Sequence, residues 1–116
     1  MLIRKMNDVE AETLDVDGAQ NTTIRVVFGP RQGAPTFALR QVDLAGGGRT
    51  PHHRHPYEHE VVVLEGNLIM VGQDGEKPVT PGDAVLIPPD EEHQFKNASD
   101  TEPARVLCLI PVQHQK

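Results

Sequence analysis

Aromatic residues and cysteines are scarce in this 116-residue chain: it has three phenylalanines, one tyrosine, no tryptophan and a single cysteine. The hydrophobic core must therefore be built mainly from valine, leucine and isoleucine. Because Cys108 stands alone, no internal disulfide can form. The chain also has no run of about 18 apolar residues, which argues against a membrane-spanning helix.

Basic residues are outnumbered as well, 11 against 17 acidic ones, and the net charge is −6. This balance argues against nucleic acid or an anionic membrane as a partner, because both are bound by clustered lysine and arginine. The N-terminus lacks the apolar segment of a secretory signal. We therefore expect a soluble, cytoplasmic protein, and its length is typical of one domain with a core of its own.

Turn-forming residues are plentiful instead: ten glycines and ten prolines are spread along the chain. Short segments rich in β-branched residues lie between them, and none shows a sustained 3.6-residue apolar period. The strongest strand predictions are residues 22–29, 36–44, 59–66, 79–89, 93–97 and 104–112, with a hairpin turn at Asp74-Gly75. We expect the glycines of residues 45–48 to end the second of these strands. The pattern predicts an all-β sandwich or barrel of the jelly-roll type over residues 21–116, preceded by an N-terminal arm of residues 1–20.

Four of the six histidines lie between residues 52 and 59, directly before a run of three valines. His53 and His55 are two positions apart, so their rings point to the same face of an extended segment. Prolines on both sides of this pair exclude a helix. His59 follows after a short turn, and His93 begins another short strand far along the chain. Three local ligands and one distant ligand would make a divalent metal site that is coupled to folding.

Two simpler interpretations compete with a metal site. Histidines are common in surface loops, and a single one is structural more often than it is a ligand. Three within seven residues, spaced for one face, favour metal binding. A helix carrying His55 and His59 four positions apart would also offer two ligands, but Pro56 and the valines that follow argue against that helix.

Two longer motifs resemble those of the cupin family. In the first, residues 47–66, glycines enclose His53-Arg54-His55 and then His59. In the second, residues 82–97, Gly82 is followed at the family's spacing by a proline pair, by His93 and by Asn97. Fifteen residues separate the two motifs. The resemblance implies a small, single-domain jelly-roll β-barrel with a divalent metal ion near one mouth.

The chain departs from the family's pattern at two positions. Asp90 replaces a glycine in the second motif, and because aspartate tolerates a positive φ better than most residues we expect the turn to survive. His59 stands where the family usually has a glutamate ligand, and Glu60 would be the ligand if a longer spacer were in use. The six residues between His59 and Gly66 favour His59. The resemblance is then to four-histidine cupins, which implies manganese as the metal, with iron, nickel, copper and zinc as alternatives.

Four neutral imidazoles would leave a divalent ion with its full charge of +2. Such an ion is a strong Lewis acid and favours an anionic ligand. We therefore expect a small-molecule substrate that carries or acquires a negative charge.

Residues on neighbouring strands would shape the substrate pocket. By analogy with the family, Val106 and Cys108 face inward, and Phe95 shares the face of His93. Cys108 is then either a small apolar neighbour of the metal or simply a buried core thiol. Arg40 would bind a substrate anion if its face of the strand is inward, and would be a solvated surface residue if that face is outward.

Four more polar residues lie in or near the motifs or at the C-terminus. We expect His52 to face solvent and His114, near the C-terminus, to have no role. Glu58 and Glu60 either orient the ligand rings through their N–H groups or are ordinary surface charges.

The resemblance supports three functions. The first is a metal-dependent oxidoreductase of the dioxygenase type that acts on a small organic substrate. The second is a metal-dependent isomerase, decarboxylase or lyase, and the third is a non-catalytic small-molecule binder. Activity that survives the removal of oxygen would separate the second from the first. A homodimer is expected as well, because edge strands need cover and the N-terminal arm can pair across an interface.

Overall fold

Nine β-strands and three single-turn 3-10 helices make up the computed structural model, which describes residues 1–116. The strands are β1 (Glu12–Thr13), β2 (Gln20–Phe28), β3 (Phe37–Arg49), β4 (His59–Glu65), β5 (Leu68–Gly72), β6 (Gly75–Val79), β7 (Ala84–Ile87), β8 (Gln94–Asn97) and β9 (Ala104–Pro111). The 3-10 helices are η1 (Met6–Asp8), η2 (Pro30–Gln32) and η3 (Val112–His114). The all-β prediction is confirmed. No helix has the length and apolar character needed to cross a membrane.

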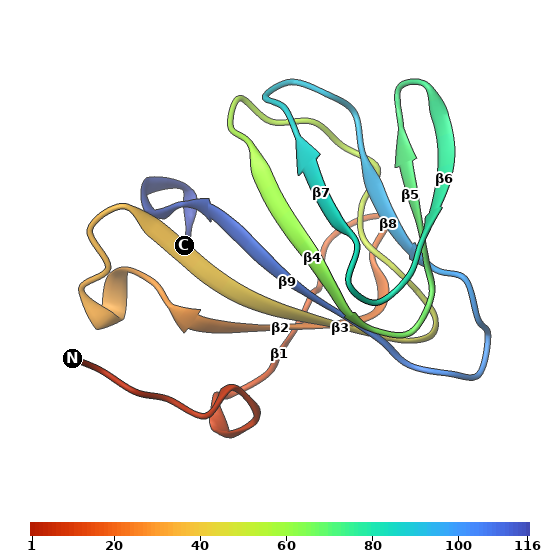
Figure 1. Ribbon diagram of the computed structural model, residues 1–116. Coiled ribbons are helices and arrows are strands. Elements are labelled where there is room, and N and C mark those ends of the chain that lie inside the picture. Colours follow the sequence, from red (N-terminus) through yellow and green to blue (C-terminus); the bar gives the residue numbers. More distant parts are fainter.

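All strands belong to one antiparallel sheet in the order β6-β5-β8-β3-β9-β4-β7, with β2 and β1 added beside β3. The sheet curls into a half-barrel, so that β5, β6 and β8 face β4 and β7 across its interior (Figure 1). The long strand β3 connects the two halves. It pairs with β9 over residues 37–44 and with β8 only at Arg49.

The glycine-rich segment 45–48 does not end the strand, contrary to the expectation from sequence, because β3 continues to Arg49. Gly47 has a φ of 72°, a conformation that other residues rarely adopt. A side chain at Gly46 would collide with the backbone of Asp100, and one at Gly48 would meet the carbonyl oxygen of Asn21. The glycines therefore let the strand bend closely past its neighbours, from one half of the sheet to the other.

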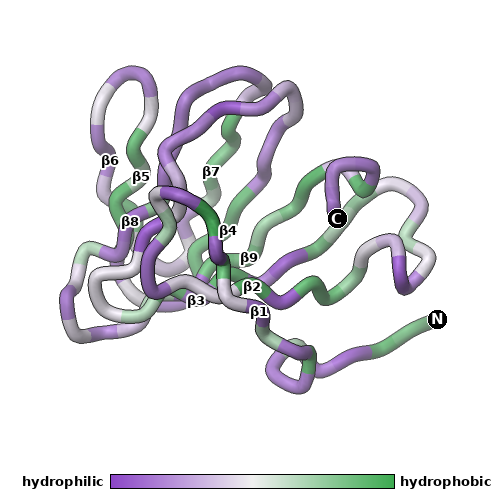
Figure 2. Tube along the Cα trace, turned by 180° about the vertical axis from the view of Figure 1, so that it is seen from behind, coloured by the Kyte–Doolittle hydropathy of each residue, from purple (hydrophilic) through white to green (hydrophobic).

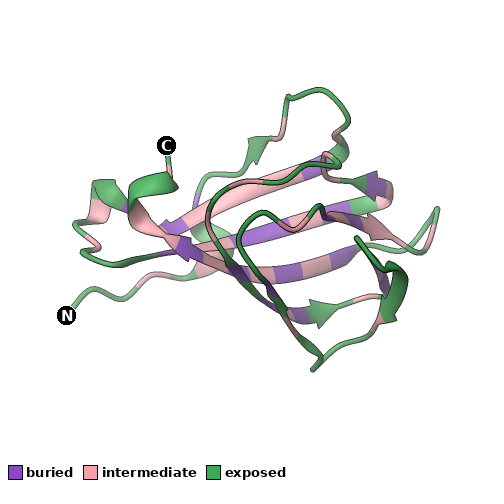
Figure 3. Cartoon of the chain, turned by 90° about the horizontal axis from the view of Figure 1, so that it is seen from above, coloured by how far each residue is buried: buried purple, intermediate pink, exposed green.

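The core lies on the concave face of the sheet and follows the period-two alternation of the strands. Buried and partly exposed residues alternate along β9, whereas in β3 the adjacent Gln41 and Val42 are both buried. Buried residues concentrate on the strands and exposed ones on the loops (Figure 3), and hydrophobic residues line β4, β7 and β9 while the loops are hydrophilic (Figure 2). The buried cluster is aliphatic apart from one phenylalanine and one cysteine. Its members are Ala38, Val42, Leu44, Val61, Val63, Leu68, Met70, Ile87, Phe95, Ala104, Val106, Cys108 and Ile110.

The N-terminal segment packs against its own chain. Its short strand β1 pairs with β2, in register Glu12 to Ile24. The guanidinium of Arg4 donates to the carbonyl oxygen of Val27 at 2.6 Å, and that of Arg25 donates to Val9 at 3.0 Å. This segment therefore covers part of the sheet within one molecule.

Candidate metal centre

Two loops and two strand ends bring the predicted histidines together. His53 and His93 form an isolated β-bridge, in which each backbone N–H donates to the other residue's carbonyl oxygen, at 3.1 and 2.9 Å. The backbone N–H of Asp90 donates to the carbonyl oxygen of His55 at 2.8 Å. Asp90 has a φ of 66°, so it adopts the positive φ expected at this position, where the family has a glycine. These bonds join the two sequence motifs at one end of the half-barrel.

The four rings lie close together, and the three of His53, His55 and His93, without His59, form the group whose ligand atoms could share a metal ion. Ring centroids are 4.9 Å apart for His53 and His93 and 5.1 Å for His53 and His55. His59, the first residue of β4, lies with its centroid 4.6 Å from that of His55 and 5.0 Å from that of His93. The ligand nitrogens of His53, His55 and His93 all lie within 4.8 Å of one another. A cluster of this size could hold one metal ion.

Backbone carbonyl groups orient two of these rings. His55 Nδ1 lies 2.9 Å from the carbonyl oxygen of Tyr57, and His93 Nδ1 lies 2.8 Å from that of Glu91. Since a carbonyl oxygen only accepts, each Nδ1 carries the ring proton and each Nε2 is left with a free lone pair. The Nε2 atom of His93 is buried and has no hydrogen-bond partner. A buried acceptor without a donor fits a metal ligand.

The suggested role of the glutamates in orienting the rings is not seen. Glu58 and Glu60 are exposed and bond to none of the histidines. Glu60 lies on the outer face of the sheet, where it lines an apolar groove beside Val62 and Leu86. The alternation along β4 therefore directs the ring of His59, rather than the carboxylate of Glu60, toward the other histidines.

His59 is held differently from the other rings. Its Nε2 lies 2.7 Å from Nε2 of His55, and its Nδ1 lies 3.0 Å from Sγ of Cys108. Because His55 Nε2 offers a lone pair, His59 carries its proton on Nε2 in this arrangement, and the thiol of Cys108 donates to Nδ1.

The site keeps the imidazoles of His53, His55 and His59 neutral. Burial lowers the pKa of His59 to about 2, with further lowering by the positive charge of Arg40 and by His55. Burial and then the neighbouring His93 lower the pKa of His53 to about 4. Burial also lowers the pKa of His55. These rings are therefore unprotonated at neutral pH, which is the form that binds metal ions.

The chain matches a known family over the residues that form this site. Residues 40–110 match the family model described as Cupin domain. The chain belongs to the cupin family.

The relatives of this cupin include proteins of several functions. It is 31% identical over 107 residues to the polyketide synthase CurC of Streptomyces cyaneus, a match that covers 90% of this chain and 69% of the relative. It is 27% identical to auxin-binding protein T85 of Nicotiana tabacum, over 94% of this chain and 63% of that protein. Among solved structures, the polyketide cyclase RemF of Streptomyces resistomycificus is similar with a TM-score of 0.90 and 35% identity, covering 97% of this chain and 80% of that chain.

The four predicted pocket residues of this cupin all lie on the concave face. Val106 and Cys108 belong to the buried core, and burial raises the pKa of the Cys108 thiol. The Phe95 ring packs against His59 and His93, with centroids 6.2 and 6.3 Å away. Arg40 also points inward, and its Nη2 donates to Sγ of Cys108 at 3.2 Å.

An aromatic stack that the sequence did not reveal covers one side of the site. Tyr57 stacks on His55 with 3.8 Å between centroids and an angle of 6°. His114, for which no role was expected, stacks on the other face of Tyr57 at 4.1 Å and 12°. The 3-10 turn η3 brings His114 back to the histidine loop. No spacing rule links residues 57 and 114, so only the folded chain could place them together.

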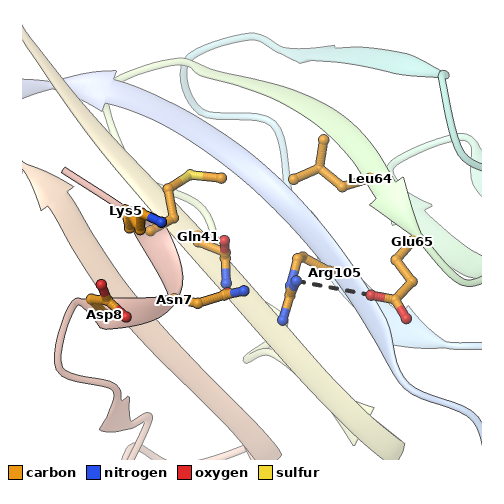
Figure 4. Close-up of a pocket in the computed structure, with 8 residues that line it drawn as sticks. Lys5, Asn7, Asp8, Gln41, Leu64, Glu65 and Arg105 are labelled. Atoms are coloured by element: carbon orange, nitrogen blue, oxygen red, sulfur yellow. Dashed lines mark ion pairs between the residues drawn. The ribbon is translucent and has the colours of Figure 1, made fainter. Parts of the chain in front are cut away.

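Cavities lie on both faces of the cupin sheet. One of about 240 Å³ lies beside His93 and Phe95, between β5 and β7. Another of about 490 Å³ lies under the N-terminal segment, where Lys5, Asn7 and Asp8 face Gln41 and Arg105 (Figure 4). No histidine or cysteine lines this second cavity, so it offers no comparable set of ligands.

Proposed function

We propose that this cupin binds one divalent metal ion through the Nε2 atoms of His53, His55, His59 and His93, and that it is an enzyme acting on a small organic substrate. The observation that carries the proposal is the buried, unpartnered Nε2 of His93 among three other imidazoles. Backbone carbonyl groups orient the rings of His55 and His93, as groups around a metal site hold its ligands.

The bound ion would supply Lewis acidity to an oxygen atom of the substrate. Four neutral ligands leave its charge of +2 undiminished, so it would favour an anionic group. Imidazole suits manganese, iron, nickel, copper and zinc alike, and manganese is our proposal for the native ion. If the ion takes the Nε2 lone pairs of His55 and His59, the ring proton of His59 moves to Nδ1 and faces Cys108.

For the reaction, we favour a redox-neutral cyclisation of a polyketide-type substrate. The similarity to RemF, named a polyketide cyclase, and to CurC, named a polyketide synthase, supports this class. Such substrates carry enolisable carbonyl groups, which a Lewis acid activates. A metal-dependent oxidoreductase of the dioxygenase type is the second candidate, because imidazole ligands also suit redox-active iron, copper and manganese.

Metal content tests the site. Elemental analysis of the purified protein should give one metal ion per chain, and the variants His59→Ala and His93→Ala should lose most of it. His52→Ala is the matched control, because His52 lies in the same loop with an exposed side chain. Unchanged metal content in both ligand variants would overturn the proposed site.

Oxygen dependence tests the reaction. Turnover of phenolic and poly-β-keto substrates that continues under anaerobic conditions supports cyclisation. Turnover that needs oxygen supports the oxidoreductase. A ligand that raises the melting temperature and is recovered unchanged, without turnover of any substrate tested, would show a binding protein instead.

We also propose that the protein is a homodimer. Support comes from the apolar outer face of β4, β7 and β9, where Val62, Leu86, Leu107 and Leu109 line an open groove. Sedimentation at micromolar concentration should give the mass of two chains, and a monomer under these conditions would contradict the proposal.

A further inference from the structure

Arg40 is the exception among the half-buried arginines of the sheet. Arg25 and Arg105 each form an ion pair of 2.6 Å with Asp43. None of the five ion pairs in the chain includes Arg40. Its Nε is buried and has no hydrogen-bond partner, and its Nη2 donates only to the thiol of Cys108. A guanidinium has five N–H donors, so most of its hydrogen-bonding capacity is unused.

The position of Arg40 places this unused capacity next to the histidines. Arg40 lies directly opposite Cys108 in the pairing of β3 with β9. The Sγ atom of Cys108 contacts Nη2 of Arg40 at 3.2 Å and Nδ1 of His59 at 3.0 Å. One thiol therefore separates the guanidinium from the proposed metal ligands. After burial, Arg40 is the largest contributor to the lowered pKa of His59, which agrees with this proximity.

No carboxylate forms an ion pair with Arg40 on the concave face. The buried cluster around Cys108 is apolar and holds no acidic residue. The carboxylates of Asp74 and Glu91 line the cavity beside His93, and neither forms an ion pair with Arg40. A half-buried cation without a counter-ion is costly, and an anion that binds next to it recovers that free energy.

We infer that Arg40 binds an anionic oxygen of the substrate, so that the substrate is a small organic anion such as a carboxylate, enolate or phenolate. The inference rests on the proposed function, because it places the anion between Arg40 and the metal ligands. The planar guanidinium forms paired, charge-assisted hydrogen bonds to such groups. The metal ion and Arg40 would then both favour a negatively charged substrate, each contacting it from its own side.

Isothermal titration calorimetry with benzoate and benzamide tests the inference, because these two probes share a shape and differ in charge. Both are titrated into metal-free and zinc-loaded protein. The variants are Arg40→Gln, which removes the charge, and Arg40→Lys, which keeps it. Arg54→Gln is the matched control, since Arg54 is an exposed arginine in the histidine loop.

We expect wild-type protein to bind benzoate at least about tenfold more tightly than benzamide. In metal-free protein, Arg40→Gln should weaken benzoate binding by about ten- to a hundredfold and remove the preference, because hydrogen bonds to charged groups are strong. In zinc-loaded protein it should reduce the preference, because the metal ion still attracts the carboxylate. Arg40→Lys should retain part of the preference for benzoate, because lysine keeps the positive charge but lacks the planar guanidinium that forms paired hydrogen bonds. Arg54→Gln should change benzoate binding by no more than about twofold, because exposed charges are screened.

The other outcomes separate the two proposals. If zinc binds fully and Arg40→Gln leaves the preference for benzoate unchanged, the inference is wrong while the metal site stands. If no metal binds, the proposed function fails, and the metal-free titrations still decide the role of Arg40. If Arg40→Gln and Arg54→Gln lose the same amount of benzoate affinity, the anion is attracted by the overall positive charge near the site rather than bound by Arg40, and the inference is wrong. If circular dichroism shows that Arg40→Gln does not fold, wild-type protein and Arg40→Lys test the inference instead. The inference is wrong if these two proteins show no preference for benzoate over benzamide, or do not bind benzoate at all.

Discussion

The substitution His93→Leu should have opposite effects on stability without and with metal. His93 is only 4% exposed, and its Nε2 is buried without a partner. An unsatisfied buried polar group costs about 1–3 kcal/mol. Leucine removes that cost and also loses the hydrogen bond from Nδ1 to Glu91, worth about 1 kcal/mol. In the metal-free protein we therefore expect the variant to be between equal to wild type and about 2 kcal/mol more stable.

Metal reverses this order. A ligand at a hundred times its dissociation constant stabilises the folded state by about 2.7 kcal/mol. Wild-type protein should gain this amount, whereas the variant, lacking one ligand, should gain little. The melting temperature of wild type should then rise above that of the variant by several degrees, at about 4 °C for each kcal/mol in a domain of this size.

Urea denaturation followed by circular dichroism, with a chelator and then with excess zinc or manganese, measures both free energies of unfolding. His52→Leu is the control and should match wild type under both conditions, because His52 is exposed. The reasoning would be refuted if His93→Leu were destabilised by the same amount with and without metal. His93 would then be an ordinary core histidine.

Three further predictions concern the surroundings of the site. Cys108→Ala should weaken metal binding about tenfold or more in a competition assay, because the thiol contacts Nδ1 of His59, whereas a merely buried thiol would leave affinity unchanged. His114→Ala should lower the free energy of unfolding by about 0.5–1 kcal/mol through loss of its stack on Tyr57, and equal urea midpoints for variant and wild type would contradict this. The metal-free protein should lose stability as pH falls from about 6.5 toward 4, because unfolded histidines bind protons there while His53, with its pKa lowered to about 4, and His59 do not. Urea midpoints at pH 7.5 and 5 test this, and no decrease would show that the folded histidines titrate normally.

Much of the fold follows from patterns within short segments. Short segments rich in β-branched residues between turns predict the strands. The inward face of β9 followed only from the resemblance, because Leu107 and Leu109 make its other face apolar as well, and the face of Arg40 stayed open. The alternation of side chains along an extended segment places His53 and His55 together. The glycines of residues 45–48 were misjudged, because a glycine that ends a strand and one that lets it bend past a neighbour look alike in the sequence.

The sequence by itself determined the all-β fold, the family and the histidines that meet, because side-chain alternation and motif spacing are local properties of the chain. Only the tertiary structure decided what those histidines face. It directed the carbonyl groups of Tyr57 and Glu91 to the rings, stacked His114 on Tyr57, and left Arg40 on the concave face without an ion pair. Such contacts join segments that are distant in the chain or depend on a loop's path, and they arise from packing, which no local spacing encodes.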